Sequence, residues 1–236
     1  MKTLNILIFL LIFNTFILLG YLSSTITGKA TYERISVNVT RVIDGDTVDT
    51  DIGRIRMLGI NTPEKKNPGY EEALDFLKQY ENKTIELEER GKDKYNRTLA
   101  YIYYQNKLLN SEILRQGLAN LYVYDEDENY QELEKAEKYA RDNNLGLWKK
   151  SLNYGCIQLI QLKYDEGGER CTNNEQLILN NICNNIQAIL KDDANHIEML
   201  NFSQGIYIQN FSCVWNDEGD SLYLRDEQGL LLFYRY

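Results

Sequence analysis

The sequence predicts an α+β region followed by an all-β region, and two observations support that prediction. Between residues 31 and 150, short runs of β-branched residues alternate with segments of helical periodicity. After residue 151 the helical periodicity ends, and short apolar runs are separated by clusters of Gly, Asn and Asp. We therefore expect two folded regions, at 31–150 and 151–236, that lie close together because no linker rich in Pro, Gly or Ser separates them.

The first region has the pattern of a small barrel. Runs of β-branched residues predict strands at Ile35–Ile43, Thr47–Ile52, Arg54–Ile60, Thr84–Glu88 and Thr98–Tyr104. Apolar residues at helical spacing predict helices at Glu72–Tyr80, from Asn110 or Ser111 through Ala119, and at about 130–143. Five short strands with interspersed helices are typical of a five-stranded β-barrel of the OB type.

The second region has the pattern of an all-β sandwich. Its short apolar runs predict strands at Ile157–Leu162, Gln176–Asn180, Ile206–Ile208, Ser221–Leu224 and Leu230–Tyr234. The segment Asp226–Gly229 has the composition of a hairpin turn between the last two strands.

The N-terminal segment indicates export. Residues 4–22 are almost continuously apolar, longer than the core of a usual signal peptide and just long enough to span a bilayer. We expect residues 1–30 to be a signal peptide or an N-terminal membrane anchor. The rest of the chain is then expected outside the cell or at its surface.

The cysteines agree with export. All four lie in the last third of the chain, at Cys156, Cys171, Cys183 and Cys213. An even number of cysteines in an exported region predicts disulfides rather than a zinc site, and three pairings are possible.

Charge is distributed unevenly along the 236 residues. The formal net charge of −9 is unusual for a protein that binds nucleic acid through a basic face. Residues 31–150 hold 19 Lys and Arg against 23 Asp and Glu, whereas residues 151–236 hold 5 against 12. The basic residues of the first region can therefore still form a local patch.

An ordered set of residues in the first region is suited to phosphodiester hydrolysis. Asp46 and Asn61 lie at expected strand ends, and their oxygens, with a backbone carbonyl, suit Ca²⁺ or Mg²⁺. Glu64 follows Asn61 closely enough to orient or deprotonate a water of that cation. Arg56 and Arg97 can chelate phosphate oxygens bidentately. Stacking faces or phosphate hydrogen bonds are offered by Tyr95, Tyr122 and Tyr124.

Each of these residues alone has an ordinary structural interpretation. The Asp-Gly-Asp-Thr segment is usually a turn, Arg56 could be a surface strand residue, and Glu64 could be a solvated loop charge. Only the ordered combination points to a hydrolytic site. The single histidine, His196, lies far outside it, so hydrolysis would depend on carboxylates, arginines and a cation.

Residues from about Ser36 to Trp148 resemble the staphylococcal nuclease (thermonuclease) family. The matching stretches are Val42–Val48, Arg56–Glu64, Asp93–Tyr103, Arg115–Ala119 and Gly146–Trp148. The resemblance implies an OB-fold barrel and Ca²⁺-dependent cleavage of phosphodiester bonds in DNA and RNA.

The same resemblance implies roles for individual residues. It suggests that Asp46, Asn61 and the carbonyl of Thr62 bind calcium, and that Glu64 is the general base. Arg56 and Arg97 would hold the scissile phosphate. The residues implied to contact the substrate are Lys94, Tyr95, Tyr122 and Tyr124. Asn61 stands where the best-known members carry Asp, so we expect weaker calcium binding or a broader choice of divalent cation, Mg²⁺ included.

The C-terminal segment from Cys156 to Tyr236 resembles a lamin-tail-like domain, which is an immunoglobulin-type β-sandwich. The matching stretches are Leu190–His196 and Val214–Asp226. We assign this part no catalysis, and its partner stays open.

The leading hypothesis is an exported or membrane-anchored, calcium-dependent nuclease that acts on DNA or RNA as a monomer. Two other functions stay open: a nucleic-acid-binding OB module without catalysis, and a cell-envelope attachment protein. The joint presence of Asp46, Arg56, Glu64 and Arg97 favours the nuclease, because a binding module does not need this set.

Overall fold

The computed structural model describes residues 32–122, 127–164, 175–193, 196–212, 214–215 and 219–236. Residues Arg34–Tyr236 form one compact unit. Within this unit we call the described residues up to Lys150 the barrel region and those from Ser151 onward the tail. In these described residues no helix is long and apolar enough to cross a membrane, and the apolar segment at 4–22 lies outside them.

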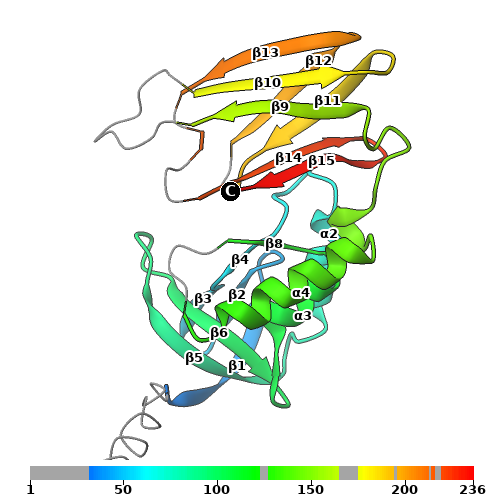
Figure 1. Ribbon diagram of the computed structural model, residues 1–236. Helices are drawn as coiled ribbons and strands as arrows, with labels where there is room; N and C mark the ends of the chain where they lie inside the picture. Colours follow the sequence, from blue (N-terminus) through cyan, green and yellow to red (C-terminus); the bar gives the residue numbers. More distant parts are fainter. Residues whose placement is uncertain (1–31, 123–126, 165–174, 194–195, 213, 216–218) are drawn as a thin grey trace, which may run out of the picture. The chain divides into compact units, whose positions relative to one another are not determined.

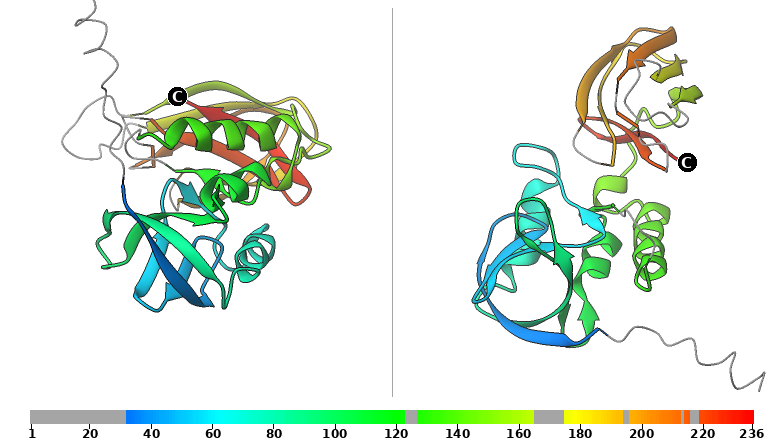
Figure 2. Two further views of the ribbon diagram at one scale, coloured as in Figure 1. Left: turned by 90° about the horizontal axis from the view of Figure 1, so that it is seen from below. Right: turned by 90° about the vertical axis from the view of Figure 1, so that its left-hand side faces the viewer.

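Five strands of the barrel region close into a barrel, which is seen end-on in the right-hand view of Figure 2. They are β1 (Arg34–Val42), β2 (Thr47–Thr50), β3 (Gly53–Met57), β5 (Thr84–Lys92) and β6 (Thr98–Tyr104). Their order is β3-β2-β1-β5-β6, and the parallel pairing of β3 with β6 closes the ring (Figure 1). The two-residue strand β7 (Lys107–Leu108) pairs with β6. The predicted OB-type barrel is confirmed.

Alternation of side chains explains why these segments form a barrel. In β1, Val37 and Val39 are buried, whereas Asn38 and Thr40 between and beyond them are exposed. Successive side chains of a strand point to opposite faces, so the valines enter the core while their neighbours face solvent. Gly53 opens β3 with a φ of 133°, a value that favours glycine, and thereby allows the tight turn from β2.

The third predicted strand is divided in the structure. The strand β3 ends at Met57 rather than at Ile60, and β4 (Ile60–Asn61) is a separate strand paired with β8 (Asn120–Leu121). Between them Gly59 adopts a φ of 76° and turns the chain away from the barrel sheet. This turn carries Asn61 to a second, two-stranded sheet.

Three helices belong to the barrel region: α2 (Tyr70–Lys78), α3 (Leu109–Arg115) and α4 (Tyr130–Asp142). The helix α3 ends at Arg115, not at Ala119 as predicted. The reason is Gly117, whose φ of 72° leaves the helical region and where a Cβ would lie 2.2 Å from the carbonyl oxygen of Leu145.

The sequence offered Asn110 or Ser111 as the cap of α3, and Asn110 does not cap it. The helix begins one residue earlier, at Leu109. Instead, the Asn110 side chain is buried, where its Oδ1 accepts from the N–H of Ile102 at 2.9 Å and its Nδ2 donates to the carbonyl of Leu58 at 2.8 Å. It therefore joins α3 to the barrel through two backbone groups.

The tail is all-β, and its two sheets enclose one apolar core. One sheet has the order β13-β10-β9, formed by β9 (Ile157–Lys163), β10 (Glu175–Asn181) and β13 (Gly205–Phe211). The other has the order β12-β11-β14-β15, formed by β11 (Ile186–Lys191), β12 (Ile197–Phe202), β14 (Ser221–Asp226) and β15 (Gly229–Arg235). This agrees with the predicted sandwich. The resemblance to a lamin tail stays a prediction.

Two strands of the tail, β11 and β12, were not predicted. In β11, Ile186, Ala188 and Leu190 are buried, but the apolar Ile189 between them points outward and hides the alternation. The hairpin between β14 and β15 is confirmed at Asp226–Gly229.

One disulfide is present among the described residues, between Cys156 and Cys183. It joins the start of β9 to the turn between β10 and β11. Cys171 and Cys213 lie outside the described residues, so the predicted second pair stays a prediction.

A small aromatic core joins the barrel region to the tail. Trp148, in the 3₁₀ turn η1 (Gly146–Trp148), is fully buried, with the rings of Tyr223 and Phe233 at 5.9 and 4.9 Å between centroids. The N–H of Leu230 donates to the carbonyl of Lys149 at 2.8 Å. The chain therefore enters the tail through paired backbone, in agreement with the expectation that the two regions lie close together.

Candidate active site

The turn between β1 and β2 positions Asp46. The N–H of Asp46 donates to Oδ1 of Asp44 at 3.1 Å. Gly45 lies between the two aspartates, where a Cβ would lie 2.6 Å from Cβ of Ala73 and 2.8 Å from Oγ1 of Thr62. Only glycine permits this approach. The Asp-Gly-Asp segment is therefore a tightly packed turn that fixes the position of Asp46.

The carboxylate of Asp46 is buried and has four hydrogen-bond or ion-pair partners. Its Oδ2 accepts from the N–H and from Oγ1 of Thr62, at 3.0 and 2.9 Å. Its Oδ1 accepts from Oγ1 of Thr47 at 3.1 Å and lies 3.2 Å from Nε of Arg56. These groups compensate the burial of a charged side chain and hold it in one orientation.

Arg56 lies between Asp46 and Asn61. Its Nη2 donates to Oδ1 of Asn61 at 3.3 Å, and its Nη1 donates to the carbonyl of Met57 at 2.5 Å. The Arg56 side chain is only 12% exposed. We call Asp46, Arg56, Asn61 and Thr62 the Asp46 cluster. The fold thus brings four of the predicted site residues into mutual contact.

Asp44 was given no role from the sequence, although it lies beside this cluster. Burial, and after it the negative charge of Asp46, raises the pKa of Asp44 to about 6. The signal was present in the sequence, because Asp44 is the first aspartate of the Asp-Gly-Asp segment.

Asn61 makes a contact with the tail that the sequence did not suggest. Its Nδ2 donates to the backbone carbonyl of Asp193 at 3.1 Å, across 132 residues of sequence. The Asp193 side chain in turn accepts from the hydroxyl of Tyr223 at 2.7 Å and from Oγ of Ser221 at 2.9 Å. An amide can donate to a carbonyl and a carboxylate cannot, so Asn at this position fits the tail in a way that Asp does not.

Glu64 lies just outside the Asp46 cluster, on the loop that follows β4. Its side chain is exposed, and its carbonyl accepts from the N–H of Asn67 at 2.9 Å, which closes a turn. Pro63 restricts the chain between Asn61 and Glu64. Glu64 is therefore accessible to solvent and close in sequence to the buried cluster.

Arg97 is positioned by Asp93, four residues earlier. The Asp93 carboxylate accepts from Nε of Arg97 at 2.6 Å and from the backbone N–H groups of Arg97 and Tyr95, each at 2.9 Å. Burial alone would raise the pKa of Asp93, but these hydrogen bonds outweigh it and hold the pKa below its usual value. The turn before β6 therefore fixes the stem of Arg97.

Lys94 and Tyr95 lie on the same turn. Tyr95 is 69% exposed, and its ring centroid lies 5.2 Å from Nζ of Lys94 and 5.5 Å from Cζ of Arg97. We call the exposed Glu64, Lys94 and Tyr95, together with the half-buried Arg97, the exposed group. It offers two cations and an aromatic face to solvent.

The pairing of β3 with β6 relates Arg97 to the Asp46 cluster. Arg56 is the register partner of Leu99, two residues beyond Arg97. Adjacent strands lie about 4.8 Å apart and rise about 3.3 Å per residue, which puts the two arginine Cα atoms on the order of 8 Å apart. The two guanidiniums therefore come from neighbouring positions of one sheet.

Tyr122 follows β8 directly. Its N–H donates to the carbonyl of Gly59 at 3.0 Å, and β8 pairs with β4 through Asn61 and Asn120. The structure therefore places Tyr122 beside the strand that carries Asn61. Tyr124 lies outside the described residues.

The Asp46 cluster offers only oxygen ligands to a cation. Among the described residues, no group of three or more His, Cys, Asp or Glu side chains could hold a metal ion. The available donors are the carboxylate of Asp46, the amide oxygen of Asn61 and the carbonyl of Thr62. This chemistry fits a hard divalent cation that keeps several waters, with one carboxylate to bind it.

Comparison with known proteins identifies the barrel region. The family described as staphylococcal nuclease homologue matches residues 54–150. A thermonuclease of Staphylococcus hyicus is 35% identical over 124 residues, which cover 47% of this chain and 73% of that protein. An uncharacterized protein of Methanocaldococcus jannaschii is 34% identical over 158 residues, covering 52% and 76%. A prophage-derived endonuclease of Bacillus subtilis is 33% identical over 135 residues, covering 50% and 46%.

The family match covers most of β3, all of β5 and β6, and Arg56, Asn61 and Thr62 of the Asp46 cluster, whereas Asp46 itself precedes it. The match to the Staphylococcus hyicus protein extends over more than two thirds of that relative. The chain belongs to the staphylococcal nuclease family.

Proposed function

We propose that this protein is a nuclease that hydrolyses phosphodiester bonds of DNA or RNA with the help of a divalent cation. The preferred cation in this proposal is calcium. The observation that supports this most is the Asp46 cluster, in which the guanidinium of Arg56 lies within hydrogen-bonding distance of both the Asp46 carboxylate and the Asn61 amide oxygen. The thermonuclease and endonuclease names of its relatives agree with the proposal.

The chain's own residues have distinct parts in the proposed reaction. Arg56 and Arg97 bind oxygens of the scissile phosphate and stabilise the charge that develops as the phosphorus becomes five-coordinate. Glu64, exposed and beside the cluster, takes a proton from the water whose oxygen forms the new bond to phosphorus, while the bond to the leaving oxygen breaks. Each well-placed donor lowers the barrier by on the order of 3 kcal/mol.

A cation bound by Asp46, Asn61 and the Thr62 carbonyl would supply a Lewis acid for the phosphate and its attacking water. Calcium suits the donors because they are oxygens and leave room for waters. Asn61 supplies an oxygen without a negative charge, so we propose modest affinity and some tolerance for Mg²⁺ or other divalent ions.

We further propose that residues 31–150 and 151–236 are two domains and that the protein acts outside the cell or at its surface. The apolar segment at residues 4–22 and the disulfide between Cys156 and Cys183 support export, because disulfides persist in oxidising compartments. N-terminal sequencing of the mature protein would test this. A mature chain that begins near residue 31 indicates a cleaved signal, whereas one that retains residues 4–22 and fractionates with membranes indicates an anchor.

One assay tests the activity. The purified chain is incubated with single-stranded and double-stranded DNA and RNA in calcium, in magnesium, or in excess chelator. We expect cleavage with calcium, slower cleavage with magnesium, and none with chelator. Cleavage that is unaffected by chelator would refute the role of the cation. Binding of nucleic acid without cleavage under every condition would favour the non-catalytic binding module.

A further inference from the structure

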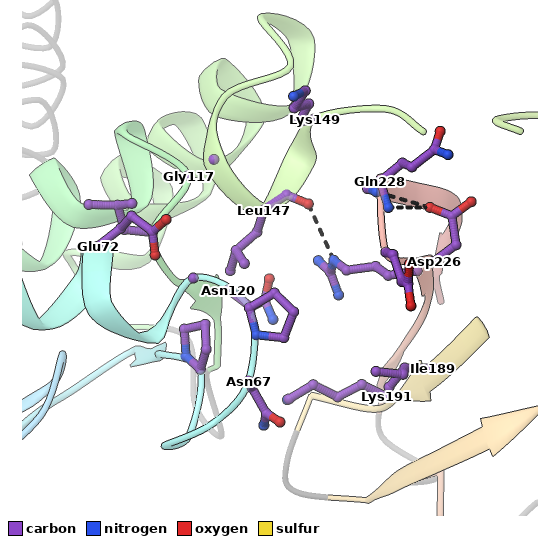
Figure 3. A pocket seen from close by; sticks show the side chains of 18 of the residues that line it. Asn67, Glu72, Gly117, Asn120, Leu147, Lys149, Ile189, Lys191, Asp226 and Gln228 are labelled. Atoms are coloured by element: carbon purple, nitrogen blue, oxygen red, sulfur yellow. Dashed lines mark hydrogen bonds between the residues drawn. The ribbon is translucent and has the colours of Figure 1, made fainter. Parts of the chain in front are cut away.

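A cavity of about 560 Å³ lies beside the loop that carries Glu64. The barrel region contributes the loop residues Pro63 and Asn67 and the segment that contains Leu147, whereas the tail contributes Lys191 at the end of β11 and Arg225 in β14. Figure 3 shows Leu147 and Lys149 on one side of this cavity and Lys191 and Asn67 on another. Its volume is in the range of pockets that bind small organic ligands.

Arg225 is the most unusual residue of the cavity wall. Its Nε donates to the carbonyl of Leu147 at 3.3 Å, and its guanidinium lies 4.9 Å from the ring of Tyr223. Its Nη2 is fully buried and has no hydrogen-bond partner among the described residues. No carboxylate within that part of the chain forms an ion pair with it. The charge of Glu137, beyond ion-pair distance, favours its protonated form, so the guanidinium in the cavity wall is only partly compensated.

Lys191 brings a second positive charge to the same cavity. Its Nζ donates to the carbonyl of Asp192 at 2.9 Å. Burial lowers the pKa of Lys191 below its usual value, and the charge of Arg225 adds to that decrease, whereas the negative charges of Asp192, Asp193 and Asp220 oppose it. Burial also lowers the pKa of Arg225, to about 10. An anion between the two side chains would relieve both effects.

The acidic residues of the wall do not supply that anion. Asp226 accepts hydrogen bonds from Oγ of Ser151 at 2.6 Å, from Nδ2 of Asn153 at 3.1 Å, and from the N–H groups of Gln228 and Gly229 at 2.9 and 3.0 Å. Burial would raise the pKa of Asp226, but these four donors lower it below its usual value. Its charge is thus engaged in the β14–β15 turn. The other two acidic wall residues, Glu72 and Glu227, are exposed.

The rest of the wall is largely apolar and includes Pro63, Pro68, Leu118, Leu147, Ile189 and Ile197. Such surfaces accept a flat ring or a sugar, whereas guanidinium and ammonium groups accept a phosphate. The cavity also adjoins the Asp46 cluster, since Pro63 directly follows Thr62, and Lys191 is two residues from Asp193, whose carbonyl accepts from Asn61. A ligand here would therefore lie next to the proposed catalytic residues.

We propose that this cavity binds one nucleotide of the nucleic-acid substrate, with a phosphate between Lys191 and Arg225 and the sugar or base on the apolar wall. The inference rests on the proposed function and names a second contact for the same substrate, which the tail provides. The tail then contributes to the binding of longer strands and takes no part in the chemical step.

The test uses the full chain and three variants. In Arg225→Met and Lys191→Met the charge is removed and an unbranched, flexible side chain is kept. Lys163→Gln is the matched control, because Lys163 also belongs to the tail but is exposed on β9 and does not line the cavity. Binding of a fluorescent single-stranded DNA is measured by anisotropy in chelator, so that no strand is cleaved. Thermal unfolding checks that each variant is folded.

We expect the Kd for the strand to rise about tenfold in Arg225→Met and in Lys191→Met, and to stay within about twofold of the original in Lys163→Gln. The slope of log Kd against the logarithm of the salt concentration should fall by about one in each cavity variant, because one cation fewer contacts a phosphate. Cleavage of a minimal substrate, a nitrophenyl phosphodiester of one nucleoside, should keep its kcat and KM. Replacement of either of these largely buried positive charges by Met is not expected to lower the unfolding midpoint.

Equal Kd values in the chain and in both cavity variants would overturn the proposal, as would an equal loss in Lys163→Gln. A free nucleoside monophosphate and inorganic phosphate, each tested as a competitor, separate the sources of the phosphate. Competition by the nucleotide alone supports a nucleotide site, whereas equal competition by inorganic phosphate contradicts it. If no strand is cleaved in calcium but the Kd values still differ, the proposed function fails and the cavity site stands.

Discussion

The two parts of the candidate site differ in how the fold supports them. Asp46, Arg56, Asn61 and Thr62 are mostly buried and hydrogen-bond one another, whereas Glu64, Lys94 and Tyr95 are exposed and Arg97 is tied to a single carboxylate. A buried polar group contributes to folding as well as to function, because losing one partner leaves the other unsatisfied. An exposed group can be replaced with little effect on folding. Substitutions should therefore separate the Asp46 cluster from the exposed group.

The largest effect is expected from Asp46→Asn. It removes the one carboxylate of the proposed cation site and, with it, the ion pair with Arg56. The side chains of that pair are 12% (Arg56) and 8% (Asp46) exposed. We expect activity to be lost and the free energy of unfolding to fall by about 3 kcal/mol, as for other broken buried pairs. Denaturant unfolding and a nuclease assay measure the two effects.

The control is Asp49→Asn on the neighbouring strand, where Asp49 pairs with Arg54 at 2.7 Å in a more exposed setting. It should cost less than about 1 kcal/mol and leave activity intact. An Asp46→Asn protein as stable as this control would show that the cluster is not important for folding.

Glu64→Gln and Arg97→Ala should affect activity far more than stability. Loss of a general base or of a phosphate-binding guanidinium lowers kcat by about 10²–10⁴-fold. The unfolding midpoint should not change in Glu64→Gln, because that side chain is solvated. It should fall only slightly in Arg97→Ala, because two backbone N–H groups still donate to the Asp93 carboxylate. Glu71→Gln, on the exposed first turn of α2, is the matched control for charge. Rates near those of the original chain in either site variant would reject the assignment.

Asn61→Asp should shift stability and cation affinity in opposite directions. The carboxylate would lose the hydrogen bond to the Asp193 carbonyl and repel it, at a cost of about 1–3 kcal/mol. A second negative charge beside Asp46 should at the same time lower the calcium concentration needed for half-maximal activity. Calcium titrations of activity and unfolding curves at saturating chelator check both. Unchanged stability would mean that the tail does not select Asn at this position.

The smallest effect is expected from Asp93→Asn. Arg97 loses its charged partner, and we expect kcat to fall about tenfold, because the guanidinium is no longer oriented. Since the pKa of Asp93 is lowered in the folded chain, its ionised form stabilises the fold above the unfolded value of about 4, and this contribution is lost as the pH falls through the folded pKa. The stability difference between the original chain and the variant should therefore be constant from pH 8 to about 5 and shrink at lower pH.

The sequence predicted the barrel well because its signals are local. The β-branched runs of β1 and β2 and the apolar face of α2 each lie within a few residues. The end of α3 was wrong because the reason for it, the close approach of Gly117 to Leu145, depends on a segment about thirty residues away. In the tail, the outward-pointing Ile189 concealed β11 for a similar reason: burial on one face is decided by the whole sheet.

The same distinction applies to the candidate site. Asp46, Asn61 and Glu64 could be selected from two short motifs, and the fold brings Asp46 and Asn61 into one cluster through Arg56. The bond from Asn61 to Asp193, and the joint placement of Lys191 and Arg225, join positions that are far apart in sequence and lie in stretches without a motif for binding. No local pattern could have revealed them, because only tertiary packing creates the contact.

The pairing of Leu230 with the backbone at Lys149 and Ser151 has a practical consequence for engineering. The family match ends at Lys150, which makes that position an obvious place to truncate the gene or to fuse another module. A chain cut after Lys150 would leave the carbonyl of Lys149 without the N–H of Leu230 and expose the indole of Trp148 to water. A fragment that ends at Lys150 is thus expected to aggregate and to be poorly soluble unless Trp148 is replaced. Fusion proteins that carry the tail should include the last turn of the barrel region.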